Sequence, residues 1–79
     1  MFHRMEQTTT ERTAAVVRAE LARRKIRGAD LAQGLGLSRT TMWRRLNGTY
    51  PFDVEELAYI ADHLGVPLSV LLPEQTTAA

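Results

Sequence analysis

The sequence predicts an all-α fold, a single compact domain of five helices, from three observations. Apolar residues recur at three- and four-residue spacing through most of the chain, as they do on the buried face of a helix. Glycine and proline separate these stretches, and the alternating pattern of a strand is sparse. The 79 residues include no cysteine, so one core must be held together by packing rather than by disulfides or thiolate-bound metal.

The first helix is expected from about Thr10 to Lys25, with Ala14, Val17 and Leu21 facing the core. We expect residues 10–72 to form the domain, residues 1–9 a flexible arm and residues 73–79 a frayed tail. The end of the first helix is basic, and two interpretations are open: charge that suits the negative end of the helix dipole, or contacts to phosphate. The residues concerned are Arg23, Arg24, Lys25 and Arg27.

The stretch from Gly28 to Gly48 predicts two short helices joined by a tight turn. Leu31 and Leu35 face inward on the first of them. Gly36 supplies the left-handed backbone that a helix end requires, and Ser38 can accept a hydrogen bond from a free amide at the start of the second. This is the pattern of a helix-turn-helix, which presents side chains to DNA.

The second of these helices, at about residues 38–47, has one polar face and one apolar face. Met42 and Leu46 point inward, and the opposite face carries no carboxylate from Ser38 to Gly48. A solvated helix normally mixes charges of both signs, so this face is suited to an anion. Its three arginines are Arg39, Arg44 and Arg45, although Arg45 stands at a border where its stem can cover the edge of the core.

Charge is unevenly distributed along the chain. Residues 1–48 hold ten basic and four acidic side chains, a net charge of +6, whereas residues 49–79 hold five acidic side chains and no lysine or arginine. Such asymmetry indicates contact with nucleic acid or membrane. No apolar run approaches the roughly 20 residues that span a bilayer, and the first ten residues do not resemble a signal peptide, so we expect a cytoplasmic protein of a bacterium or a phage.

Beyond Gly48 the sequence predicts two more helices. Pro51 interrupts the helical pattern, and Asp53 with Glu56 three residues later forms a capping-box pattern for a fourth helix that ends at Gly65. A short fifth helix, at about residues 68–72, is expected to close the core.

Two consecutive segments, GADLAQGLGLSRTTMWRRLNG and DVEELAYIADHLGVPLSVLL, resemble the Cro/repressor helix-turn-helix family, also called XRE-like or lambda-repressor-like. The resemblance covers roughly Ala14 to Leu72. Resolvases, sigma factors and tetracycline-type repressors carry strings similar to GLGLSRTTMWRRL, but they lack the downstream loop and helices. The resemblance implies a lambda-repressor-like fold whose second motif helix enters the major groove of a double-stranded DNA operator.

The same resemblance assigns roles to individual positions. Arg39, Thr40 and Arg44 correspond to residues that touch base edges, and arginine can donate two hydrogen bonds to guanine while a threonine methyl can meet that of thymine. Trp43 has two interpretations: its ring packs over the loop near Tyr50 and Phe52, or it lies against the sugar-phosphate backbone. The candidate phosphate contacts are Arg27, Gly28 through its backbone amide, Ser38, Trp43, Asn47, Thr49 and Tyr50.

The sequence departs from the family pattern in three respects. The loop after Gly48 lacks the lysine or arginine that relatives often carry there. Leu21 and Leu46 stand where many relatives pair a buried arginine with a glutamate, and we expect these two leucines to touch. Gly28 replaces a frequent glutamine.

The expected function is that of a sequence-specific DNA-binding regulator, a Cro-like repressor that blocks transcription sterically. We expect a monomer or weak homodimer that pairs on an inverted-repeat operator. The apolar candidates for the dimer interface are Pro67, Leu68, Val70 and Leu72.

An enzyme and a protein-interaction module are the two other classes of function to compare with a DNA-binding regulator. No catalytic constellation, glycine-rich phosphate loop or metal-ligand cluster is present in the sequence, so we expect no enzyme activity, no cofactor and no small-molecule ligand. The alternative is an antitoxin or adaptor that uses a helix-turn-helix scaffold to hold a protein.

Overall fold

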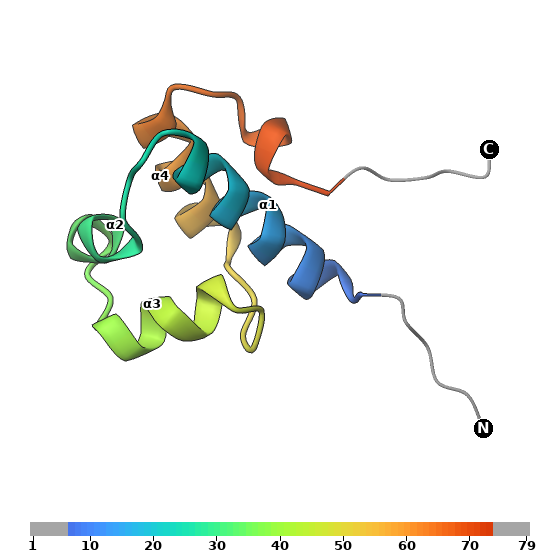
Figure 1. Cartoon of the computed structure of the whole chain (residues 1–79), viewed down its shortest axis with the longest axis horizontal. Helices are drawn as coiled ribbons and strands as arrows, with labels where there is room; N and C mark the ends of the chain where they lie inside the picture. The colour runs from blue at the N-terminus through green and yellow to red at the C-terminus, as the bar shows by residue number, and fades with distance from the viewer. Residues whose placement is uncertain (1–6, 74–79) are drawn as a thin grey trace.

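The computed structural model describes residues 7–73 of the chain. It contains four α-helices, α1 (Thr9–Arg23), α2 (Gly28–Leu35), α3 (Arg39–Leu46) and α4 (Val54–Leu64), and one 3-10 helix, η1 (Leu68–Leu71) (Figure 1). There is no β-strand among the described residues, which agrees with the all-α prediction. The predicted fifth α-helix is instead a four-residue 3-10 helix. Most of the expected N-terminal arm and C-terminal tail lies outside the described residues.

Both ends of α1 differ slightly from the prediction. The helix begins at Thr9 because Thr8 and Glu11 form a capping box: Glu11 N donates to Thr8 Oγ1 at 3.0 Å, and Thr8 N donates to Glu11 Oε1 at 2.9 Å. The helix ends at Arg23, before Lys25, because Lys25 takes a left-handed conformation with a φ of 57°.

The turn between α2 and α3 has the predicted geometry. Gly36 is left-handed, with a φ of 72°. The amide of Leu37 donates to the Ala32 carbonyl at 2.9 Å, which turns the Leu37 side chain onto the core. Thr41 N then donates to Ser38 Oγ at 3.1 Å, so Ser38 caps α3 as expected.

The start of α4 is also as predicted. Glu56 N donates to Asp53 Oδ1 at 2.7 Å, and Asp53 N donates to Glu56 Oε1 at 3.0 Å. This reciprocal pair satisfies two amides that a helix start leaves without an intrahelical partner.

Each element contributes at least one side chain to a single core. Val17 of α1, Leu31 of α2, Ile60 of α4 and Leu71 of η1 are completely buried, and Met42 of α3 is nearly so. Helix α1 runs through the middle of the molecule, with α3 on one side and η1 on the other (Figure 1). Because α3 packs only through its inner face, its outer face is left open to solvent.

Candidate nucleic-acid interface

The outer face of α3 consists of five exposed residues: Arg39, Thr40, Trp43, Arg44 and Asn47. Their spacing places them along one side of the helix, opposite the buried Met42. No carboxylate lies on α3. We call this set of five residues the α3 outer face.

Arg45 does not belong to this face, and its inclusion among the anion-facing arginines was wrong. Its Nε donates to Glu56 Oε1 at 3.0 Å and its Nη2 donates to Glu56 Oε2 at 3.1 Å, a bidentate ion pair between α3 and the first turn of α4. The two side chains are 21% and 12% exposed. The charge of Arg45 is therefore neutralised within the fold.

This ion pair affects both ionisable groups. The hydrogen bonds from Arg45 lower the pKa of Glu56, and this effect outweighs the opposing effect of burial. The hydrogen bonds to Glu56 likewise raise the pKa of Arg45. Sequence reasoning missed the pair because its partners lie 11 residues apart across an irregular loop.

Arg44 lies next to an aromatic ring. Its Cζ is 5.9 Å from the centroid of the Tyr50 ring, within the range of a cation–π interaction. The loop holds Tyr50 there because the Arg44 carbonyl accepts hydrogen bonds from both Thr49 N, at 3.0 Å, and Tyr50 N, at 3.3 Å. The Arg44 guanidinium thus remains exposed but has a preferred orientation.

Trp43 is 64% exposed, so the interpretation that its ring packs over the loop is wrong. Phe52, its expected neighbour, is buried in the core instead. Trp43 borders a hollow of about 220 Å³ where the start of α2 meets α3. The hollow is lined by Gly28, Ala29, Arg39, Met42, Trp43 and Leu46.

Three of the polar phosphate candidates are bonded within the protein. The Ser38 hydroxyl donates to Thr41 Oγ1 at 3.0 Å. Asn47 Oδ1 accepts from Thr49 N at 2.9 Å and from Thr49 Oγ1 at 2.6 Å. Phosphate contacts by Ser38 and Thr49 through their hydroxyls would require these bonds to break, whereas the amide nitrogen of Asn47 is oriented by them.

Gly28 and Leu46, two of the departures from the family pattern, are related by packing. A Cβ atom added to Gly28 would lie 2.5 Å from Leu46 Cδ1, so the leucine occupies the space that a side chain at position 28 would need. Leu46 is half-buried and packs on the core cluster that includes Leu21. Direct contact between the two leucines stays a prediction.

Arg18, which sequence reasoning did not single out, fixes the end of α3. Its Nη1 donates to the carbonyl of Leu46, the last residue of that helix. A cation at this position satisfies a carbonyl without an intrahelical partner and suits the negative end of the helix dipole. The partners lie 28 residues apart, so no local pattern reveals the contact.

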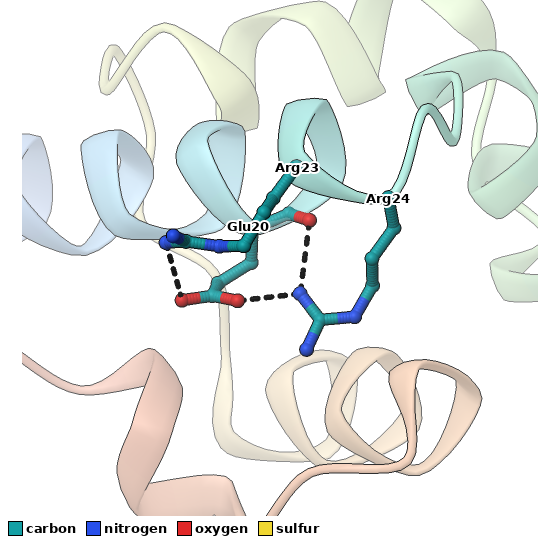
Figure 2. A network of polar contacts seen from close by, with 3 residues as sticks. All are labelled: Glu20, Arg23 and Arg24. Carbon is teal, nitrogen blue, oxygen red and sulfur yellow. Dashed lines mark hydrogen bonds and ion pairs between the residues drawn. The ribbon is translucent and has the colours of Figure 1, made fainter.

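The basic end of α1 is held by an ion-pair cluster. Glu20 accepts hydrogen bonds from Arg24 Nη1 and from Arg23 Nη2, the latter at 3.2 Å (Figure 2). The hydrogen bond from Arg24 lowers the pKa of Glu20. Successive helical residues are about 100° apart, so Glu20 lies nearly opposite Arg18, which contacts α3. This arrangement favours the helix-end interpretation of Arg23 and Arg24 over contact with phosphate.

The remaining candidates lie at the start of α2 and around η1. Arg27 is exposed at the N-cap of α2, with its Nη2 3.6 Å from Asp30 Oδ1. Of the interface candidates, Pro67, Val70 and Leu72 are exposed, while Leu68 is half-buried against the core.

Within residues 7–73 no helix is long and apolar enough to cross a membrane, and no cluster of histidine and carboxylate side chains could hold a metal ion.

The BetR domain matches residues 5–79, almost the whole chain. The chain belongs to the BetR domain family. This BetR-domain chain is similar in structure to the clp gene regulator ClgR from C. glutamicum, known from a crystal structure, with a TM-score of 0.75 and 21% sequence identity. The similarity covers 84% of this chain and 86% of the other, and at this identity it establishes a shared fold. A comparison with curated proteins finds no match.

Proposed function

We propose that this BetR-domain protein is a sequence-specific, double-stranded DNA-binding transcriptional regulator of the Cro/repressor type, with a lambda-repressor-like fold. The observation that carries the proposal is the α3 outer face, which is exposed and cationic and has no carboxylate. An eight-residue helix is roughly 12 Å long at 1.5 Å per residue, and the major groove admits a helix of this kind. The similar crystal structure is that of a gene regulator, which supports the same class of function.

Arg39, Thr40 and Arg44 are assigned to base edges, since they are exposed and chemically suited to read guanine and thymine. Trp43, Asn47 and Tyr50 border them on the same side and are assigned to the sugar-phosphate backbone. Further phosphate contacts are proposed for Arg27 and for the Gly28 amide at the first position of α2, with Ser38 and Thr49 acting chiefly through the bonds that shape the two loops.

Repression follows from occupancy of the operator. One domain of this size covers a short stretch of DNA, so tight specific binding requires two copies on a two-fold site, about one helical turn apart. The exposed apolar side chains Pro67, Val70 and Leu72 supply the contact between copies. We propose a monomer or weak dimer in solution that pairs on an inverted repeat and blocks polymerase sterically.

Selection of bound duplexes from a random DNA pool at near-physiological salt tests this function. Enrichment of an inverted repeat is the expected result. Enrichment of a short asymmetric motif would support DNA reading but contradict the two-fold arrangement. Failure to enrich any sequence would contradict the proposal and favour a protein partner, as in an antitoxin or adaptor.

A further inference from the structure

The ion pair between Arg45 and Glu56 joins α3 to α4 beside the α3 outer face. We propose that Glu56 is a positioning residue, which holds Arg45 away from DNA phosphates and thereby limits the sequence-independent part of DNA binding. This inference rests on the proposed function.

The Glu56 carboxylate is fixed before any DNA arrives. Its two oxygens accept from Arg45 at 3.0 and 3.1 Å, and Oε1 also accepts from the Asp53 amide at 3.0 Å. The Glu56 amide in turn donates to Asp53 Oδ1 at 2.7 Å. The capping box of α4 therefore sets the position of the carboxylate, and the bidentate contact sets the position of the guanidinium.

Arg45 is close enough to the proposed interface for its release to matter. It follows directly after Arg44, and consecutive helical side chains point about 100° apart, so Arg45 stands at the border of the α3 outer face. The flexible stem of an arginine allows its head group to move between neighbouring partners. Pairing with Glu56 keeps that head group on the α4 side.

The consequence for DNA binding is a matter of charge. Phosphate neutralisation supplies essentially all of the affinity for random DNA, whereas base contacts distinguish sequences. While Glu56 holds it, Arg45 adds nothing to the affinity for random DNA. Discrimination between sequences is left to Arg39, Thr40 and Arg44. The fold thus lowers the sequence-independent part of the affinity, for operator and random duplexes alike, by removing one charge from the surface.

The test compares Glu56→Gln with Glu55→Gln, a control that removes the same charge from the neighbouring, exposed position. Affinities for the selected operator and for a random duplex are measured between 50 and 200 mM salt. Each added phosphate contact steepens the dependence of log affinity on log salt by about 0.9. Glu56→Gln is therefore expected to lose about 3.5-fold more affinity per domain over this range than wild type, on the operator and the random duplex alike. Glu55→Gln is expected to keep the wild-type slope.

Arg45→Gln provides an independent readout. It is expected to keep the wild-type salt slope, whereas Arg27→Gln, which removes a cation assigned to phosphate, flattens it. The double variant Arg45→Gln/Glu56→Gln is expected to lose the steepening seen in Glu56→Gln. Circular dichroism establishes that each variant folds, and if Glu56→Gln does not, the comparison of Arg45→Gln with Arg27→Gln decides the matter.

The outcomes separate this inference from the proposed function. A wild-type protein that binds no duplex overturns both. A wild-type protein that binds its operator, with Glu56→Gln and Glu55→Gln sharing one salt slope, overturns only the role of Glu56. A flatter salt slope in Arg45→Gln than in wild type would show that Arg45 already contacts phosphate, and this result also overturns the role of Glu56.

Discussion

Arg44 combines exposure with a constrained orientation, because the Tyr50 ring lies 5.9 Å from its guanidinium. We expect Arg44→Ala to weaken operator binding by about 1–3 kcal/mol and to relax selection at one base position. Arg24→Ala removes the same charge from a residue paired with Glu20 on the far side of α1, and it is expected to leave binding unchanged. Titrations of operator and random duplexes measure both effects. Equal losses by Arg44→Ala on the two duplexes would contradict a base-reading role.

Glu56 gives stability a pH dependence whose sign follows from its lowered pKa. The carboxylate binds a proton more readily in the unfolded chain, so its contribution is complete above the unfolded pKa of about 4.3 and is lost as pH falls through the lower folded value. We therefore expect the free energy of unfolding of Glu56→Gln to fall less than that of wild type between pH 6 and pH 3. Urea denaturation at a series of pH values measures this. Parallel curves for the two proteins would refute the assignment.

Among single residues, sequence reasoning succeeded where the interaction is local. The caps formed by Ser38 and by Asp53 with Glu56 join residues three apart and could be predicted from spacing. The contact of Arg45 with Glu56 crosses an irregular loop, and that of Arg18 with Leu46 joins α1 to the end of α3. Both depend on how the helices pack and have no local sequence pattern. The spacing of Trp43 from Arg39 and Asn47 places it on the outer face, and the interpretation that its ring is packed rested instead on the gain from burying an aromatic ring.

At the level of elements, α2 packs closely against α4 at Gly34. A Cβ atom added there would lie 1.9 Å from Tyr59 Oη and 2.8 Å from Tyr59 Cζ, and the Tyr59 ring also stacks on His63 with centroids 6.1 Å apart. The Tyr59 side chain thus occupies the space that a side chain at position 34 would take.

We expect Gly34→Ala to destabilise the protein, although alanine favours a helix over glycine by about 1 kcal/mol. In a Tyr59→Ala background the same substitution is expected to stabilise by roughly 0.5–1 kcal/mol, because the clash is gone and the helix propensity remains. Chemical denaturation of the four variants measures the coupling. Additive effects would show that Tyr59 does not limit the space at Gly34.

Long helices could be predicted better than short ones. Helices α1 to α4 have repeated apolar spacing and recognisable caps, so their presence could be predicted, with their ends placed to within one or two residues. Only four residues form η1, which lies between its N-cap Pro67 and its C-cap Leu72. A helix this short is often 3-10 rather than α-helical. Apolar spacing alone does not distinguish the two.

For the whole molecule, η1 closes the core with Leu71 and leaves Leu72 outside; the two side chains are 0% and 46% exposed. We expect Leu71→Ala to lower the free energy of unfolding by about 2–5 kcal/mol, and Leu72→Ala to change it by less than about 0.5 kcal/mol. Thermal or urea unfolding of both variants measures the difference. Similar losses would mean that η1 does not close the core in this way.

The distribution of charge over the whole chain favours a nucleic-acid partner but overstates the number of basic side chains that are free to contact one. Among the described basic residues, Arg23, Arg24 and Arg45 are ion-paired within the fold, Arg27 forms an exposed ion pair with Asp30, and Arg18 is bonded to a backbone carbonyl. Net charge can be counted from sequence, whereas the pairing that cancels it at the surface depends on the positions of the helices. The cationic character of the α3 outer face thus depends on Arg39 and Arg44.

We propose above all that the α3 outer face binds DNA. The most direct test follows backbone amide shifts by NMR while the protein is titrated with the selected operator. We expect the largest changes on α3 and the first turn of α2, with η1 changing only where two copies meet. Changes confined to α4 and η1, with α3 unaffected, would contradict it.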